Sequence, residues 1–107
     1  MTWLPFAQNQ LKTVMQYVRD NFGENIAKKS FREIMRRVDE LRNFPDIGIL
    51  DRQFSTKEVM VRHLNIGPNV VYYIEDLNEI VVIAVMHHKQ SPSTINRTII
   101  YALGLND

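Results

Sequence analysis

Hydrophobic residues in the first part of the chain recur three or four positions apart, which is the spacing of one face of a helix. The positions that share this face are Leu11, Val14, Met15, Val18 and Phe22. Pro5 suits a first helical turn, where a backbone N–H is not needed, and Gly23 is a typical helix-ending residue. The pattern therefore predicts a helix over about residues 5–21.

A second stripe of the same kind follows over about residues 25–43. Its apolar members are Ala27, Phe31, Ile34, Met35, Val38 and Leu41. The opposite face is basic and carries Lys28, Lys29, Arg32, Arg36, Arg37 and Arg42. Two amphipathic helices joined by a short turn that contains glycine predict an antiparallel helical hairpin over about residues 5–43.

The periodicity changes after residues 44–48, where Pro45 and Gly48 end the helical pattern. Residues 49–56 are polar and irregular and predict a loop. Segments rich in β-branched and aromatic residues then predict strands at 58–66, 70–75 and 80–87. The connections between them are short, which is typical of an antiparallel meander, here over about residues 58–88. Trp3 and Leu4 are a candidate for the stub of one further strand.

These elements predict one α+β domain over residues 1–107, in which the N-terminal helical hairpin packs on one face of a small twisted antiparallel sheet. The hairpin and the inner face of the sheet each need an apolar partner, so packing them together buries both. Tyr72 and Tyr73 are neighbours on one strand, so we expect one in the core and one on the surface. The C-terminal tail, residues 91–107, fits a weak helix or an extended segment.

Composition narrows the class of protein. The chain has no cysteine, which excludes disulfides, thiolate zinc sites and thiol nucleophiles. Its 13 basic and 12 acidic residues give a net charge of +1, which argues against a cationic coat that grips nucleic-acid backbones. The longest apolar run, residues 80–86, is too short to span a bilayer. No signal peptide is visible, so we expect a soluble cytoplasmic protein with no membrane partner.

Four residues could together carry proton-transfer chemistry. Arg62 lies inside a predicted strand, and His87, His88 and Lys89 stand at the end of the last strand. A histidine transfers protons near neutral pH, and a cation stabilises negative charge that develops on a phosphate. If these side chains converge on one sheet face, they would suffice for metal-free RNA cleavage. The alternative is an ordinary strand-end histidine beside solvated cations.

The sequence gives no reason to expect a metal or a cofactor. His87 and His88 are adjacent on a strand and point to opposite faces, so they cannot hold one metal ion. Phosphate-binding loops, nucleophile elbows and paired zinc histidines are absent from the sequence. The basic face of the second helix is either a solvated surface or a docking surface for an acidic partner or nucleic acid.

Several segments stand in a distinctive order along nearly the whole chain. They are Phe6–Ala7, Tyr17–Val18, the helix-ending run 41–48, Val61–Gly67, Val70–Ile74, Ile80–His87, and then Lys89 and Pro92. In this order and spacing the chain resembles toxins of the RelE/ParE superfamily, from bacterial type II toxin–antitoxin systems. The superfamily has a helical hairpin on a twisted antiparallel sheet, which agrees with the fold predicted above.

The resemblance implies a growth-inhibiting toxin that is neutralised by a cognate antitoxin protein. Such antitoxins usually wrap the toxin with a segment that folds on binding, which gives a hetero-oligomer; a homo-oligomer is also possible. The helical hairpin and the sheet edge are the expected docking places. The candidate residues for binding the antitoxin or the target are Lys28, Arg32, Arg36, Arg62 and Lys89.

Two activities occur in the superfamily. ParE-like members inhibit DNA gyrase by binding it, whereas RelE-like members are ribosome-dependent mRNA endonucleases. In the second case the resemblance implies catalytic roles for Arg62, His87, His88 and Lys89. However, Ile95 stands near the place of a frequent tyrosine of that branch. Gln53 and Ser55 replace its frequent lysines. These departures and the near-neutral charge favour gyrase inhibition and leave the endonuclease as the alternative.

Overall fold

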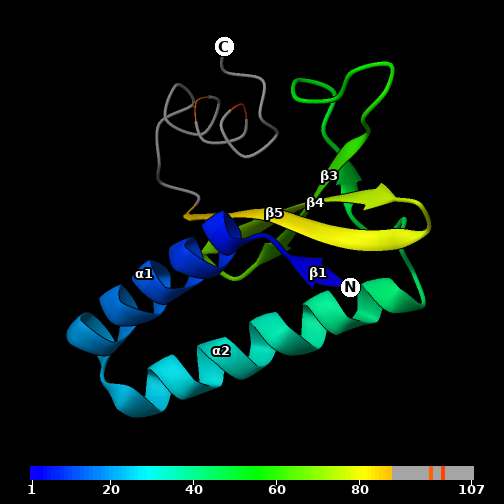
Figure 1. Cartoon of the computed structure of the whole chain (residues 1–107). Helices are drawn as coiled ribbons and strands as arrows, with labels where there is room; N and C mark the ends of the chain where they lie inside the picture. The colour runs from blue at the N-terminus through cyan, green and yellow to red at the C-terminus, as the bar shows by residue number, and fades with distance from the viewer. Residues whose placement is uncertain (88–96, 98–99, 101–107) are drawn as a thin grey trace.

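The computed structural model describes residues 1–87, 97 and 100, and two helices precede most of the sheet in it. The elements are β1 (Thr2–Trp3), α1 (Pro5–Phe22), α2 (Glu24–Asp39), the short 3₁₀ helix η1 (Glu40–Arg42), β2 (Ile49–Leu50), β3 (Val61–Ile66), β4 (Asn69–Asp76) and β5 (Glu79–His87). Both helices lie on the same side of the sheet (Figure 1). This α+β arrangement confirms the predicted fold class. The predicted tail at 91–107 lies outside the described residues, apart from two positions.

The helical hairpin forms as predicted, with a sharp connection at Gly23, whose φ of 94° is open to glycine but strained for other residues. Buried residues of the two helices face the sheet: Ala7, Met15, Val18, Ala27, Ile34 and Val38. Two residues of the predicted apolar stripes are exposed, Phe22 with an exposed fraction of 61% and Phe31 with one of 43%. Phe22 lies at the hairpin turn, where it packs edge-on against Tyr17. Neither helix is long and apolar enough to cross a membrane, and the same holds for the rest of the described chain.

The sheet has five strands in the order β1-β5-β4-β3-β2. The antiparallel meander β3-β4-β5 is confirmed, and the strand that is apolar on both faces, β5, lies between two neighbours. β1 pairs with β5 in parallel, with Thr2 opposite Val81, so the expectation of a wholly antiparallel sheet is wrong at this pair. β1 supplies hydrogen-bonding partners to the edge of β5 that faces away from β4. The meander alone would leave that edge unpaired.

The connection between α2 and β3 also differs from its prediction. The predicted loop at 49–56 contains β2, in which Leu50 pairs with Arg62. The predicted strand at 58–66 begins only at Val61. The hydroxyl of Thr56 accepts hydrogen bonds from the backbone N–H groups of Glu58 and Val59, which turns the chain away from the sheet there.

Apolar clusters lie on both faces of the sheet. On the helix-covered face, Tyr73 and Val85 pack with buried residues of α1 and α2. On the opposite face, Tyr72 and Met86 belong to a second cluster, against which Phe54 of the loop after β2 packs. Tyr72 and Tyr73 are therefore both buried, with exposed fractions of 6% and 1%. The expectation of one surface tyrosine is wrong because that loop covers part of the second face.

We predict that Ile34→Ala lowers the free energy of unfolding by about 2–5 kcal/mol, because it leaves a cavity between α2 and the sheet. Ile34 is only 1% exposed, whereas Ile26 on the same helix is 47% exposed. Ile26→Ala is therefore the matched control and should change stability by less than about 1 kcal/mol. Urea unfolding measures both variants. Equal losses for the two would contradict the packing of α2 described here.

Candidate binding surface between the helices

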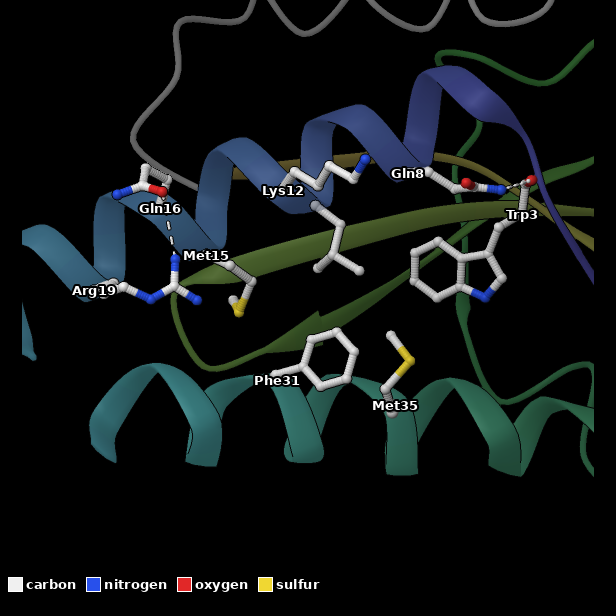
Figure 2. A pocket seen from close by; sticks show the side chains of 9 residues that line it. Trp3, Gln8, Lys12, Met15, Gln16, Arg19, Phe31 and Met35 are labelled. Atoms are coloured by element: carbon white, nitrogen blue, oxygen red, sulfur yellow. Dashed lines mark hydrogen bonds between the residues drawn. The ribbon is translucent and has the colours of Figure 1, made fainter. Parts of the chain in front are cut away.

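A hollow of about 670 Å³ lies between the two helices. Its apolar lining consists of Trp3 from β1, Leu11 and Met15 from α1, and Phe31 and Met35 from α2. Figure 2 shows Met15, Phe31 and Met35 in the space between the two helix ribbons. Apolar side chains at a surface hollow are typical of a site that a partner covers.

A second hollow of about 370 Å³ continues from the first and shares Met15, Arg19 and Phe31 with it. We call the two together the interhelical groove. Its rim is basic and consists of Lys12, Arg19, Lys28 and Arg32. No carboxylate lines either hollow, although Arg19 binds Glu24 beside it at 2.6 Å. The groove therefore combines an apolar floor with a positive rim, and it favours a partner that is apolar on one side and acidic at its flanks.

The groove follows from the width of the apolar stripe on α2. Phe31 and Met35 stand one helical turn apart at one edge of that stripe, while Ile34 and Val38 occupy its middle and are buried. The sheet covers only the middle of the stripe, so its edge turns toward α1 and solvent. In the sequence, the apolar stripe of α2 is wider than a single packing contact requires. That width could have predicted a second contact surface.

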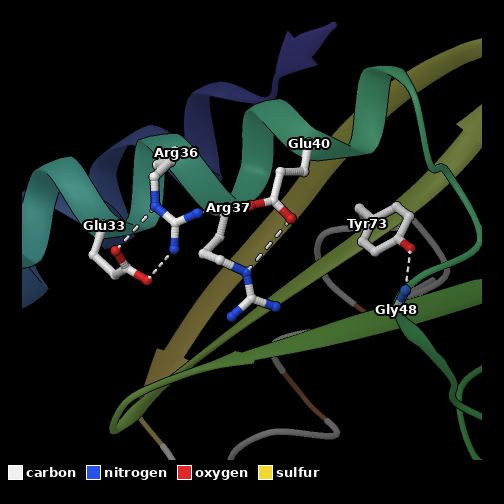
Figure 3. Close-up of polar contacts among 6 residues, drawn as sticks. All are labelled: Glu33, Arg36, Arg37, Glu40, Gly48 and Tyr73. Atoms are coloured by element: carbon white, nitrogen blue, oxygen red, sulfur yellow. Dashed lines mark hydrogen bonds and ion pairs between the residues drawn. The ribbon is translucent and has the colours of Figure 1, made fainter.

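The candidate cations on α2 fall into two groups. Lys28 and Arg32 lie at the groove, and neither forms a salt bridge within the described residues. Arg36 lies outside the groove lining and instead binds Glu33 and Glu40, at 2.8 and 2.9 Å. Figure 3 shows the Arg36–Glu33 pair on the helix surface. The hydrogen bond from Arg36 lowers the pKa of the Glu33 carboxyl. The structure thus places Lys28 and Arg32 together at the groove and keeps Arg36 away from it.

Arg62 lies on the helix-covered side of β3, next to Tyr73 of β4. Its Nη1 donates a hydrogen bond to the Gly48 carbonyl oxygen at 3.1 Å, and its Nη2 lies 3.7 Å from an oxygen of Asp46. The Tyr73 hydroxyl donates to the Pro45 carbonyl oxygen at 2.7 Å and accepts from the Gly48 N–H at 3.0 Å (Figure 3). Arg62 and Tyr73 therefore fasten the turn 45–48 to the sheet, and we call this cluster the turn anchor.

The turn anchor tolerates no larger residue at Gly48. A Cβ atom there would stand 2.5 Å from the Tyr73 hydroxyl oxygen, much closer than van der Waals contact allows. Burial raises the pKa of Tyr73, in spite of the Gly48 N–H and the Arg62 charge, which both lower it. The neutral hydroxyl therefore persists at physiological pH and can both donate and accept.

The structure does not bring Arg62 and His87 together. Arg62 pairs with Tyr73, whereas His87 pairs with Asn69 at the other end of β4. Tyr73 and Asn69 stand four positions apart on β4, which is about 13 Å along an extended strand. His87 packs edge-on against Tyr17 of α1, at a ring-centroid distance of 6.4 Å. His88 and Lys89 lie outside the described residues.

A histidine that sequence reasoning passed over lies on the other face of the sheet. Nδ1 of His63 is buried, 3.3 Å from a carboxylate oxygen of Asp51. The other Asp51 oxygen accepts hydrogen bonds from the backbone N–H groups of Gln53 and Phe54. Asp51 therefore organises the loop after β2 through these two backbone hydrogen bonds, whereas Nδ1 of His63 forms none within the described residues. Within the described part of the chain, no three His, Asp or Glu side chains gather as a metal site would require.

Comparison with known proteins identifies one family whose model covers most of the chain. A family model described as "ParE toxin of type II toxin-antitoxin system, parDE" matches residues 1–92. No curated protein matches the chain. The matched range includes every helix and strand from β1 to β5, the interhelical groove and the turn anchor.

Tyr73→Phe should lower the free energy of unfolding by about 1–3 kcal/mol, because it leaves the buried Gly48 N–H and the Pro45 carbonyl without their partner. Tyr72→Phe is the matched control, since no hydrogen bond of the described residues uses its hydroxyl, and it should be nearly neutral. Urea unfolding of the two variants gives the comparison. If Tyr73→Phe were as stable as Tyr72→Phe, the hydroxyl would not be what anchors the turn.

Proposed function

Because the chain belongs to the family of ParE toxins of type II toxin–antitoxin systems, we propose that it inhibits growth by binding DNA gyrase in the cytoplasm. We propose further that its antitoxin silences it by occupying the interhelical groove. Membership of the family implies an antitoxin partner, whereas the target and the place of docking are our proposals. The observation that carries them is an open, apolar, basic-rimmed groove in a chain whose two described candidate catalytic residues, Arg62 and His87, lie apart.

The positions of Arg62 and His87 support a binding toxin over a ribonuclease. Metal-free RNA cleavage needs a base, an acid and a cation around a single phosphate. Arg62 is committed to the turn anchor, and the strand register separates it from His87. The endonuclease alternative then depends on a site built without this pair of residues, for example around His88 and Lys89.

The chemistry of the groove supports an amphipathic segment as the antitoxin element that docks there. A helix that lays its apolar side on Leu11, Phe31 and Met35 would bury all three from water. Acidic residues at its flanks would meet Lys28 and Arg32, which have no salt-bridge partner among the described residues. Charge pairing of this kind fixes register and speeds association.

We predict that purified toxin stops gyrase from supercoiling relaxed plasmid DNA and causes cleaved DNA–gyrase complexes to accumulate. In parallel, mRNA on translating ribosomes should stay intact in the presence of the toxin. Normal supercoiling at a stoichiometric excess of toxin, together with cut mRNA, would replace the gyrase proposal by the endonuclease. The same assay on Arg62→Ala and His87→Ala would then show whether that cleavage needs either residue or uses a site elsewhere, for example around His88 and Lys89.

Charge reversal at the groove should weaken the toxin–antitoxin complex. Arg32→Glu places a carboxylate at the groove rim, and we expect at least a tenfold higher dissociation constant, about 1.4 kcal/mol. Lys29→Glu makes the same charge change at an exposed position of α2 that does not line the groove. Calorimetric titration with the antitoxin compares the two variants. Equal weakening by both would mean that only overall charge matters and that the groove is not the docking site.

A further inference from the structure

The turn between β4 and β5 holds an apolar residue in an unfavourable place. The turn has two residues, Leu77 and Asn78, with positive φ values of 50° and 64°, as in type I′ hairpin turns. Such turns favour Asn, Asp or Gly, and a leucine there is strained. Leu77 is also 93% exposed, more than the other large exposed hydrophobic residues. Neither turn geometry nor core packing accounts for a leucine at this position.

The residues around Leu77 are acidic. Glu75 and Asp76 precede it, are exposed, and form no salt bridge within the described part of the chain. Glu79 follows it and is engaged by the N-terminal ammonium group at 3.2 Å and by the Thr2 hydroxyl at 2.6 Å. We call residues 75–78 the acidic tip: one exposed apolar side chain with two available carboxylates beside it.

The interhelical groove has the complementary chemistry. Its floor is apolar, its rim carries Lys12, Arg19, Lys28 and Arg32, and no carboxylate lines it. The acidic tip cannot fold back into the groove of its own chain. Asp76 is paired with Glu79, and β5 is held on its other edge by β1 from Val81 onward, so the hairpin is fixed almost to its end. A tip that enters a groove must therefore come from another molecule.

We propose that the acidic tip of one copy of this chain docks into the interhelical groove of a second copy. Leu77 fills part of the apolar floor, and Glu75 and Asp76 face the basic rim. The contact joins two different surfaces, so it is heterologous, and its small size makes it weak and dependent on concentration. Self-association and antitoxin docking then compete for one groove. The self-association itself is independent of whether gyrase is the target.

The first test is sedimentation of the purified chain over a range of concentrations at low salt. We expect the average mass to rise with concentration and to fall again when salt screens the charges. Leu77→Asn should reduce association at least tenfold and yet raise the melting temperature, because asparagine suits the turn. Met60→Asn removes another exposed apolar side chain, 52% exposed, and should leave association unchanged.

The second test separates a specific contact from general stickiness. The double variant Glu75→Lys/Asp76→Lys and the double variant Lys12→Glu/Lys28→Glu should each lose self-association. An equimolar mixture of the two should recover association, because the rim variant keeps an intact acidic tip and the tip variant keeps an intact groove. A wild-type chain that is monomeric at every concentration would overturn the proposal. So would unchanged association of Leu77→Asn, or a mixture that does not recover.

Discussion

The hydrogen bonds of the Tyr73 hydroxyl set where the second helix leaves the sheet, and the interhelical groove depends on that position. The hydroxyl holds the turn 45–48 to β4, and Arg62 adds a hydrogen bond to the same turn. At the other end of the hairpin, the Leu4 N–H donates to the Val82 carbonyl oxygen and the Val85 N–H donates to Gln10 of α1. The two helices are thus fixed to the sheet at separate places, and a surface between them stays open to a partner.

The chain uses its described cations in two ways. Arg36 is neutralised by carboxylates of its own helix, and Arg62 supports the turn. Lys12, Lys28 and Arg32 keep their charge available at the rim of the groove. A site for RNA cleavage would instead need cations close to a histidine. The net charge of the whole chain does not reveal the basic groove, because acidic residues at the β4–β5 turn offset its positive charge.

Much of the fold could be predicted from the sequence, because periodicity reports local structure directly. The helical hairpin and the three-stranded meander follow from spacing and from Gly23, Pro45 and Gly48. β1 and β2 were less visible, since two-residue strands carry no periodicity and exist only through their partners. The site was less predictable still. The sequence favoured a solvated Arg62 over an anion ligand, and only the fold shows that Arg62 donates a hydrogen bond to the Gly48 carbonyl oxygen. Phe31 looked like a core residue because spacing cannot tell which edge of a stripe the sheet leaves uncovered.

We propose that the antitoxin holds this toxin through the interhelical groove. The chain has 5 methionines, and two of them, Met15 and Met35, line the groove, whereas Met86 is buried on the far side of the sheet. Nuclear magnetic resonance of the toxin with isotope-labelled methionine methyl groups, titrated with the antitoxin, therefore tests the claim directly. We predict that the largest shifts occur at Met15 and Met35, with little change at Met86. Unshifted Met15 and Met35 signals in a saturated complex would contradict the account.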